Sequence, residues 1–171
     1  MCAEVSQFRY AHADDLLSRP DPLIVALDQV QDPQNLGAIC RTAECAGADG
    51  VVIPERRAAE VTAAVCKASA GAVEHLPVAR VRNLADFLRE AKRAGLWCYG
   101  ADAEARSGYA SLDYRGGTVL VMGSEGRGLR PRVASCCDAL VSIPMAGVIE
   151  SLSVSAAAAV LLYAAVSSRK Q

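Results

Sequence analysis

The sequence predicts a single α/β domain built on a largely parallel sheet. Short apolar runs rich in valine and isoleucine alternate with helical patterns along the chain, as expected when crossover helices join the strands. The length of 171 residues and the apolar content of 52% suit one sizeable core and leave little room for two. The pattern therefore favours a sheet covered by helices over a bundle or a sandwich.

Six strands are expected, and each is a short apolar run next to turn-forming residues. Runs of this length are typical of buried strands rather than of helices. They cover residues 23–27, 50–54, 77–81, 96–100, 118–122 and 139–143.

The helices are expected between these strands. The first, over residues 35–46, follows Asp32 and Pro33 and ends at Gly47, which are ordinary start and stop signals. The remaining helices are expected over residues 59–69, 84–94 with Asn83 as N-cap, 131–137, and 151–166, an alanine-rich segment that reads as a buried final helix.

Charge excludes one class of protein and leaves another open. A net charge of −1 argues against a uniformly basic nucleic-acid binder. A local basic face stays open, because Arg127, Arg130 and Arg132 follow a glycine-rich stretch, and Arg56 and Arg57 end an earlier strand. The alternative is a set of unpaired arginines on a solvated surface.

Several other sites and locations are not indicated. The seven cysteines form no C-x-x-C pair and the two histidines have no catalytic companion, so we expect no disulfide framework, no metal and no hydrolytic triad. No signal peptide is visible, and no apolar run reaches the roughly 20 residues of a membrane span. We therefore expect a cytoplasmic protein that does not enter a membrane.

Three polar segments each follow an expected strand. They are "DPQNLGAICRTAECAG", which holds Asn35 and Arg41, "MGSEGRGL", which holds Glu125, and "IPMAGVIESLSVSAAAAV", which leads into the final helix. The glycine-rich segment matches neither the Rossmann fingerprint nor the phosphate loop. Ligands of open α/β sheets bind at the carboxyl ends of strands, so the three segments could converge on one site. Taken singly, each also fits a helix cap or a solvent-facing side chain.

In combination and order, these segments resemble the three motifs of the SpoU family of RNA ribose methyltransferases, within the SPOUT superfamily. The resemblance covers residues 23–165, and the stretch after the first motif is most similar to the branch that methylates a guanosine ribose in 23S ribosomal RNA. It implies a SPOUT fold with a deep C-terminal trefoil knot, S-adenosylmethionine as cofactor, RNA as partner and a homodimer whose active site takes residues from both subunits.

The resemblance also implies roles for individual residues. Arg41 would polarise and position the ribose 2′-hydroxyl and an RNA phosphate, because the pKa of arginine lies too far above neutrality for a simple base. Asn35 and Glu125 would orient Arg41 and the ribose. The residues that would bind S-adenosylmethionine are Met122, Gly123, Ser124, Gly126, Gly128, Ile143, Met145, Gly147, Ser151 and Leu152.

One residue departs from the family pattern. The third motif usually reads S-L-N-V-S, and this chain has "SLSVS", with Ser153 at the asparagine position. A serine keeps one donor and acceptor but lacks the paired groups of an amide, so we expect weakened activity. Two alternatives stay open: a guanosine methyltransferase that acts on tRNA, and a catalytically weak RNA-binding dimer.

The first residues read differently from the rest. Residues 4–10 alternate like a strand, whereas residues 11–22 are polar and end in two prolines. This opening stretch resembles the end of the linker that joins an N-terminal RNA-binding domain to the catalytic domain. We therefore expect a linker remnant over residues 1–20 and a SpoU-type catalytic domain over residues 21–171.

Overall fold

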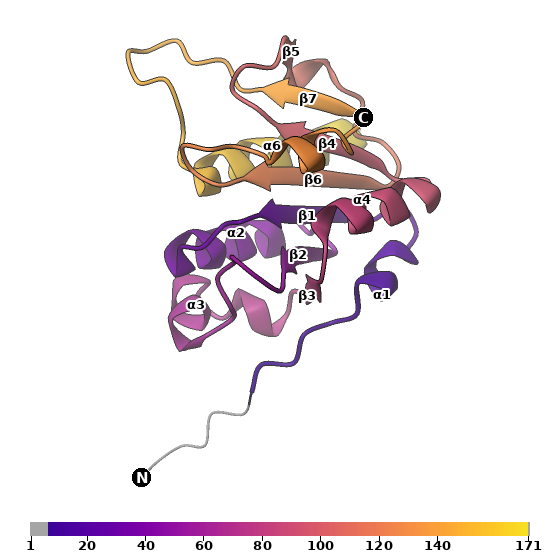
Figure 1. Cartoon of the computed structure of the whole chain (residues 1–171), viewed down its shortest axis with the longest axis vertical. Coiled ribbons are helices and arrows are strands. Elements are labelled where there is room, and N and C mark those ends of the chain that lie inside the picture. Colours follow the sequence, from indigo (N-terminus) through magenta and orange to yellow (C-terminus); the bar gives the residue numbers. More distant parts are fainter. Residues whose placement is uncertain (1–6, 171) are drawn as a thin grey trace.

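The computed structural model describes residues 7–170, and Cys2 lies outside the described residues. One sheet runs through the domain in the order β3-β2-β1-β6-β4-β7-β5, with every neighbouring pair parallel (Figure 1). The strands are β1 Leu23–Asp28, β2 Gly50–Pro54, β3 Val78–Val81, β4 Trp97–Ala101, β5 Ser107–Gly108, β6 Thr118–Gly123 and β7 Ala139–Ser142.

The expected α/β fold with a parallel sheet is confirmed, but the expected number of strands is wrong. The sheet has seven strands, because the two-residue β5 pairs with β7 at the edge. Two residues are too few to show any hydrophobic alternation. The trefoil knot stays a prediction from the resemblance.

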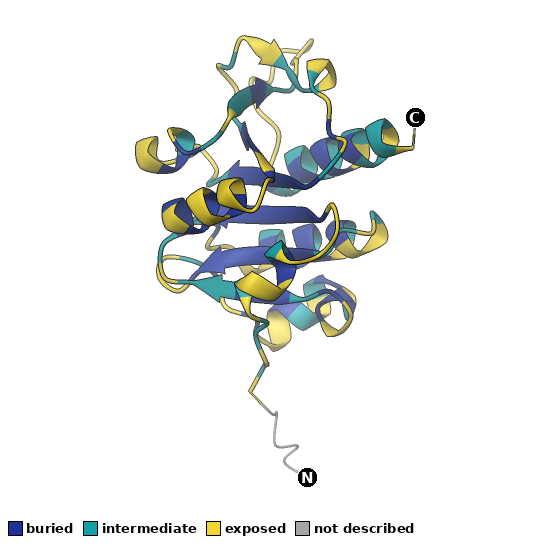
Figure 2. Cartoon of the chain, turned by 90° about the vertical axis from the view of Figure 1, so that its right-hand side faces the viewer, coloured by how far each residue is buried: buried dark blue, intermediate teal, exposed yellow. Residues whose placement is uncertain are grey.

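Helices cover both faces of the sheet. They are α1 Ala13–Leu17, α2 Pro33–Cys45, α3 Ala63–Ala68, α4 Leu84–Arg93, α5 Pro131–Ala134 and α6 Val154–Arg169, with short 3-10 helices η1 Ala72–Glu74 and η2 Tyr109–Ser111. In β1, Val25 joins the cluster formed by α2, α3 and α6, whereas Ile24 and Ala26 join the cluster formed by α1, α4 and α5. Alternate side chains of one strand thus form two cores, and the central strands β1 and β6 between them are buried except for the last residue of β6 (Figure 2).

Several expected helix boundaries are wrong, and α5, expected over residues 131–137, already ends at Ala134, where Ser135 caps it. α2 begins at Pro33, two residues early, because the Asp32 side chain accepts a hydrogen bond from the Gln34 N–H and proline suits the first turn. α3 is limited to Ala63–Ala68, since the N–H of Val61 donates to the Tyr10 hydroxyl and holds the chain before it extended. α6 begins only at Val154. The Asn83 cap of α4 is confirmed by its bonds to the N–H groups of Ala85 and Asp86.

Part of the expected linker packs on the domain. Leu16 of α1 is 1% exposed, and the N–H of Ala11 donates to the carbonyl of Val78. The interpretation of residues 1–20 as the end of a linker stays a prediction. No helix within residues 7–170 has both the length and the apolarity needed to cross a membrane.

The C-terminal end of α6 is tied to the opposite end of the sheet from its start. Arg169 donates to the carbonyl oxygens of Asp21, Pro22, Tyr114 and Gly116. Burial lowers the pKa of its guanidinium, and these bonds to four carbonyls compensate for the lost hydration.

Candidate active site

The strand order creates a crevice between β1 and β6. The chain proceeds from β1 outward to β2 and β3 on one side, whereas β6 and β4 lie on the other. Such a switch in direction opens a space outside the carboxyl ends of the two strands, where ligands of α/β proteins bind. The last paired residues there are Asp28 and Gly123, so the first and second motifs begin side by side.

The glycine-rich loop after β6 is folded tightly on itself. Ser124 and Gly128 pair across the turn, and the Gly128 N–H donates to the Ser124 carbonyl at 2.9 Å. A Cβ on Gly123 would overlap the backbone of Gly128. Gly126 and Gly128 have φ of 76° and 65°, which other residues adopt at a cost. These glycines therefore fix the shape of the loop.

A buried carboxylate anchors the far end of this loop. Asp28, 1% exposed, accepts hydrogen bonds from the Arg130 backbone N–H at 2.8 Å and from the Arg130 guanidinium at 2.8 Å. Asp28 was not among the predicted site residues, and the one signal for it in the sequence is an acidic residue directly after an apolar run. The loop is thus fastened to the end of the neighbouring strand.

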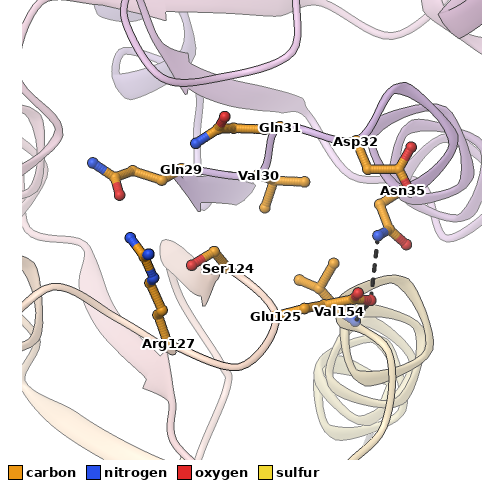
Figure 3. A pocket seen from close by; sticks show the side chains of 9 residues that line it. All are labelled: Gln29, Val30, Gln31, Asp32, Asn35, Ser124, Glu125, Arg127 and Val154. Carbon is orange, nitrogen blue, oxygen red and sulfur yellow. Dashed lines mark hydrogen bonds between the residues drawn. The ribbon is translucent and has the colours of Figure 1, made fainter.

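A cavity of about 300 Å³ lies in the crevice (Figure 3). The side chain of Glu125 reaches across it, where Oε1 accepts hydrogen bonds from Asn35 Nδ2 at 3.2 Å and from the Val154 N–H at 3.3 Å. One carboxylate therefore joins the starts of α2 and α6 to the glycine-rich loop. The lining residues are Gln29, Val30, Gln31, Asp32, Asn35, Ser124, Glu125, Arg127 and Val154.

The structure does not bring Arg41 into this cavity. Arg41 lies on α2 six residues after Asn35, which places it about 9 Å further along the axis and on another face of the helix. It is exposed, and within residues 7–170 it makes no hydrogen bond or ion pair. Asn35 and Glu125 are bonded to each other, and within one chain neither of them orients Arg41 as expected.

The predicted cofactor residues divide into two groups. Met122 through Gly128 belong to β6 and its tight loop, and Ser124 lines the cavity. Ile143 packs against the core as β7 ends. Met145, Gly147, Ser151 and Leu152 lie in the segment 144–152, which is exposed throughout and extends away from the sheet before returning to α6 (Figure 1).

Ser153 has a clear local role. It is the N-cap of α6, and its Oγ accepts a hydrogen bond from the Ala156 N–H at 3.2 Å. Serine and asparagine cap helices about equally well. The departure from the family pattern therefore preserves the start of α6.

Three thiols of the domain are held in their protonated form by burial. Burial raises the pKa of Cys40 to about 12, and it also raises the pKa values of Cys98 and Cys137 to about 12, so these thiols stay protonated at neutral pH. Between residues 7 and 170, no three His, Cys, Asp or Glu side chains gather as metal ligands would.

Comparison with known proteins adds independent information. The sequence profile of the SpoU rRNA Methylase family matches residues 22–163. The chain is 47% identical over 166 residues to a putative TrmH family tRNA/rRNA methyltransferase, YacO, of Bacillus subtilis, covering 94% of this chain and 67% of the relative. It is 50% identical over 147 residues to the 23S rRNA (guanosine-2′-O-)-methyltransferase RlmB of Xanthomonas campestris, covering 86% of this chain and 59% of that enzyme.

The fold has a close match among solved structures. The SpoU methyltransferase AviRb of Streptomyces viridochromogenes, solved in complex with AdoMet, superposes with a TM-score of 0.85 and 32% identity. The match covers 94% of this chain and 66% of that one. The present chain thus spans between half and two thirds of several relatives, including 52% of an uncharacterized tRNA/rRNA methyltransferase of Mycolicibacterium smegmatis.

Proposed function

The chain belongs to the SpoU rRNA methylase family, and from this we propose that it transfers a methyl group from S-adenosylmethionine to the ribose 2′-hydroxyl of a guanosine in 23S rRNA. The observation that carries the proposal is the junction at Glu125, where one carboxylate oxygen binds both Asn35 and the backbone of Val154. This junction unites the three sequence motifs at one cavity. The substrate class is supported by the 50% identity to the Xanthomonas enzyme.

The residues at the crevice suit S-adenosylmethionine. Carboxylates and amides line the cavity, with Arg127 as its one cationic side chain, which favours a positively charged sulfonium over a polyphosphate. Residues 125–128 of the glycine-rich loop are exposed, and the glycines among them let a ligand approach the backbone closely. The loop 122–128 would hold the cofactor from one side and Ile143, Met145, Gly147, Ser151 and Leu152 from the other. When bound, the cofactor supplies a methyl group activated by its sulfonium.

The work of the protein is then chiefly positioning. A ribose hydroxyl reacts slowly until it is aligned with the methyl carbon and its proton is partly withdrawn. Asn35 and Glu125 offer an amide and a carboxylate that are already held in place by their mutual bond and by α6. A rigid pair of this kind can accept and donate hydrogen bonds to the ribose without first being ordered.

Arg41 fits this function only with a second copy of the chain. It is exposed and lies outside the cavity formed by its own chain. We therefore propose a homodimer in which Arg41 approaches the site of the partner, where it would position the ribose hydroxyl and a phosphate. The exposed apolar residues Val148 and Ile149 support an interface.

The test is methyl transfer with two substitutions at one position. Glu125→Ala removes the acceptor for Asn35 and Val154, whereas Glu125→Gln keeps a carbonyl oxygen for both and removes only the charge. With 23S rRNA and S-adenosylmethionine carrying a labelled methyl group, Glu125→Ala should lower the rate by about a hundredfold. Glu125→Gln should retain more activity than Glu125→Ala, because it keeps the acceptor that holds Asn35 and Val154 in place.

Glu90→Gln, an exposed change on α4, is the control and should leave the rate unaltered. Primer extension on the product RNA locates the methylated nucleotide. Faster transfer to tRNA would establish the tRNA alternative, which is favoured by the Bacillus relative's description as a tRNA/rRNA enzyme. Cofactor binding by calorimetry without transfer to either RNA would contradict the proposed reaction.

A further inference from the structure

A second cavity, of about 340 Å³, lies at the same edge of the sheet. It is bordered by the ends of β2 and β3, the first turn of α4 and the start of α5. Five arginines are among the lining residues, and none of the lining residues is acidic. The lining residues are Gln29, Pro54, Arg56, Arg57, Arg82, Asn83, Leu84, Ala85, Arg130, Arg132 and Val133.

Three of these arginines keep their charge uncompensated. Within residues 7–170, no ion pair or side-chain hydrogen bond involves Arg56, Arg57 or Arg82. The other two arginines form ion pairs with acidic residues. Arg130 pairs with the buried Asp28 at 2.7 Å, and Arg132 pairs with Asp86 at the longer distance of 3.8 Å. Three free guanidinium groups around one hollow concentrate positive potential in a protein whose net charge is −1.

The backbone of the cavity wall is unusual at two positions. Gln29 and Arg57 have φ of 62° and 56°, in the left-handed region that residues with a Cβ seldom adopt. Each conformation carries a small energetic cost. At Arg57 it turns the chain directly after β2, so that consecutive arginines lie at the edge of the sheet.

Gln29 connects this cavity to the candidate active site. It lines both cavities, so they lie on either side of a single residue. A ligand long enough to occupy the first could therefore continue into the second. A nucleic acid strand has this property, because its phosphates recur at every nucleotide.

We propose that the arginine cavity binds a backbone phosphate of the substrate RNA, next to the nucleotide whose ribose occupies the active site. The inference rests on the proposed function for the identity of the substrate. Guanidinium groups bind phosphate oxygens through paired hydrogen bonds. Arg56 and Arg82, in the segments that follow β2 and β3, would bind the phosphate from two sides, while Arg130 remains bound to Asp28.

The test compares RNA binding by matched arginine variants. Arg56→Gln, Arg82→Gln and the double variant are measured against Arg106→Gln. This control makes an equal change of charge beside β5, the outermost strand on the side of the sheet opposite to β3. The probe is a fluorescein-labelled single-stranded RNA followed by anisotropy over a series of salt concentrations. Each cavity variant should bind about tenfold more weakly, and the slope of log affinity against log salt should fall by about 0.7 for each arginine removed.

Other readouts separate this inference from the proposed function. Donor binding by calorimetry should be unchanged in the cavity variants, and methyl transfer should show a raised KM for RNA at an unaltered kcat. Equal RNA binding by the cavity variants and Arg106→Gln would overturn the inference. If the unsubstituted chain transfers no methyl group, the proposed function is overturned. The comparison of RNA affinities among the arginine variants would remain valid in that case.

A further arm distinguishes RNA from a free anion. Inorganic phosphate and pyrophosphate are titrated against the same variants as competitors. RNA binding that persists at millimolar competitor supports an RNA site, whereas tight binding of pyrophosphate without any difference in RNA affinity among the variants would assign the cavity to a small anion and refute the inference. Circular dichroism confirms that each variant is folded, and Arg82→Lys serves if Arg82→Gln is not.

Discussion

The two loops that frame the candidate site differ in how they are held. The glycine-rich loop after β6 is bonded within itself, to Asp28 and, through Glu125, to α2 and α6. The segment 144–152 after β7 makes no hydrogen bond to the other described residues. Its residues Val148 and Ile149 are 95% and 75% exposed. One side of the site is preorganised by a single chain, and the other is not.

The difference shows where the missing stabilisation must come from. Backbone groups and large apolar side chains left in water gain little from staying in one conformation. A bound cofactor or a second copy of the chain can supply the contacts that order them. We therefore expect changes in the glycine-rich loop to affect folding, and changes in the segment 144–152 to affect binding and assembly.

The sharpest contrast is between two glycines. Alanine at Gly123 would place a Cβ against the backbone of Gly128, whereas nothing lies within 4 Å of the Cβ position at Gly147. Gly123→Ala should lower the free energy of unfolding by about 3 kcal/mol. Gly147→Ala should change it by less than about 0.5 kcal/mol yet weaken cofactor binding. Urea denaturation and calorimetry measure the two effects, and equal destabilisation by both variants would refute the contrast.

The anchor at Asp28 ranks next. Asp28→Ala leaves the Arg130 backbone N–H without its acceptor and frees the guanidinium, which is half exposed and can turn to solvent. The expected loss is about 2 kcal/mol of unfolding free energy. Asp113→Ala, which removes an exposed ion pair with Arg115, is the control and should have a much smaller effect. An equal loss of unfolding free energy in both variants would mean that the buried Asp28 stabilises the fold no more than an exposed ion pair does.

A smaller effect is expected at the junction of the loose segment with α6. Ser153→Ala removes the side chain that caps α6 and accepts the Ala156 N–H. It should lower the free energy of unfolding by about 1 kcal/mol, while Ser153→Asn should leave it almost unchanged. The asparagine variant also tests the departure from the family motif. Methyl transfer that rises with Ser153→Asn would confirm that serine weakens activity, and an unchanged rate would show the departure to be harmless.

The smallest effect on folding is expected at Ile149. Because its side chain is largely exposed, Ile149→Ser should alter the unfolding free energy of a dilute monomer by less than about 0.5 kcal/mol. Light scattering at higher concentration should show a shift from dimer to monomer, with Trp97→Ser, another exposed apolar residue, as control. A protein that is monomeric without substitution would contradict the proposed interface.

Local signals predicted most of the fold, and long-range contacts account for the rest. The Asn83 cap and six apolar runs are visible in short stretches of sequence, and each corresponds to an element of the structure. β5 has no such signal, because it pairs with residues of β7 that lie 34 positions away in the sequence. The late start of α3 likewise depends on Tyr10, which keeps the chain extended at Val61 and lies far from it in the sequence.

The sequence predicted which residues belong to the site better than it predicted their arrangement in space. The motifs identified Asn35 and Glu125, and the structure joins them. The resemblance gave Arg41 a role, but no sequence pattern could show that it lies outside the cavity of its own chain. Asp28 and Gln29 were missed because their importance comes from strand order and backbone conformation, which residue spacing does not encode.

Arg169 influences the position of the candidate site, although it lies at the far end of α6. It holds the last turn of α6 to four carbonyl oxygens, and Val154, fifteen residues earlier, begins the same helix and donates to Glu125. Because a straight helix is stiff, α6 keeps its two ends at a fixed separation of roughly 22 Å. The position of the backbone N–H that bonds to the Glu125 carboxylate is therefore set from the opposite end of the sheet.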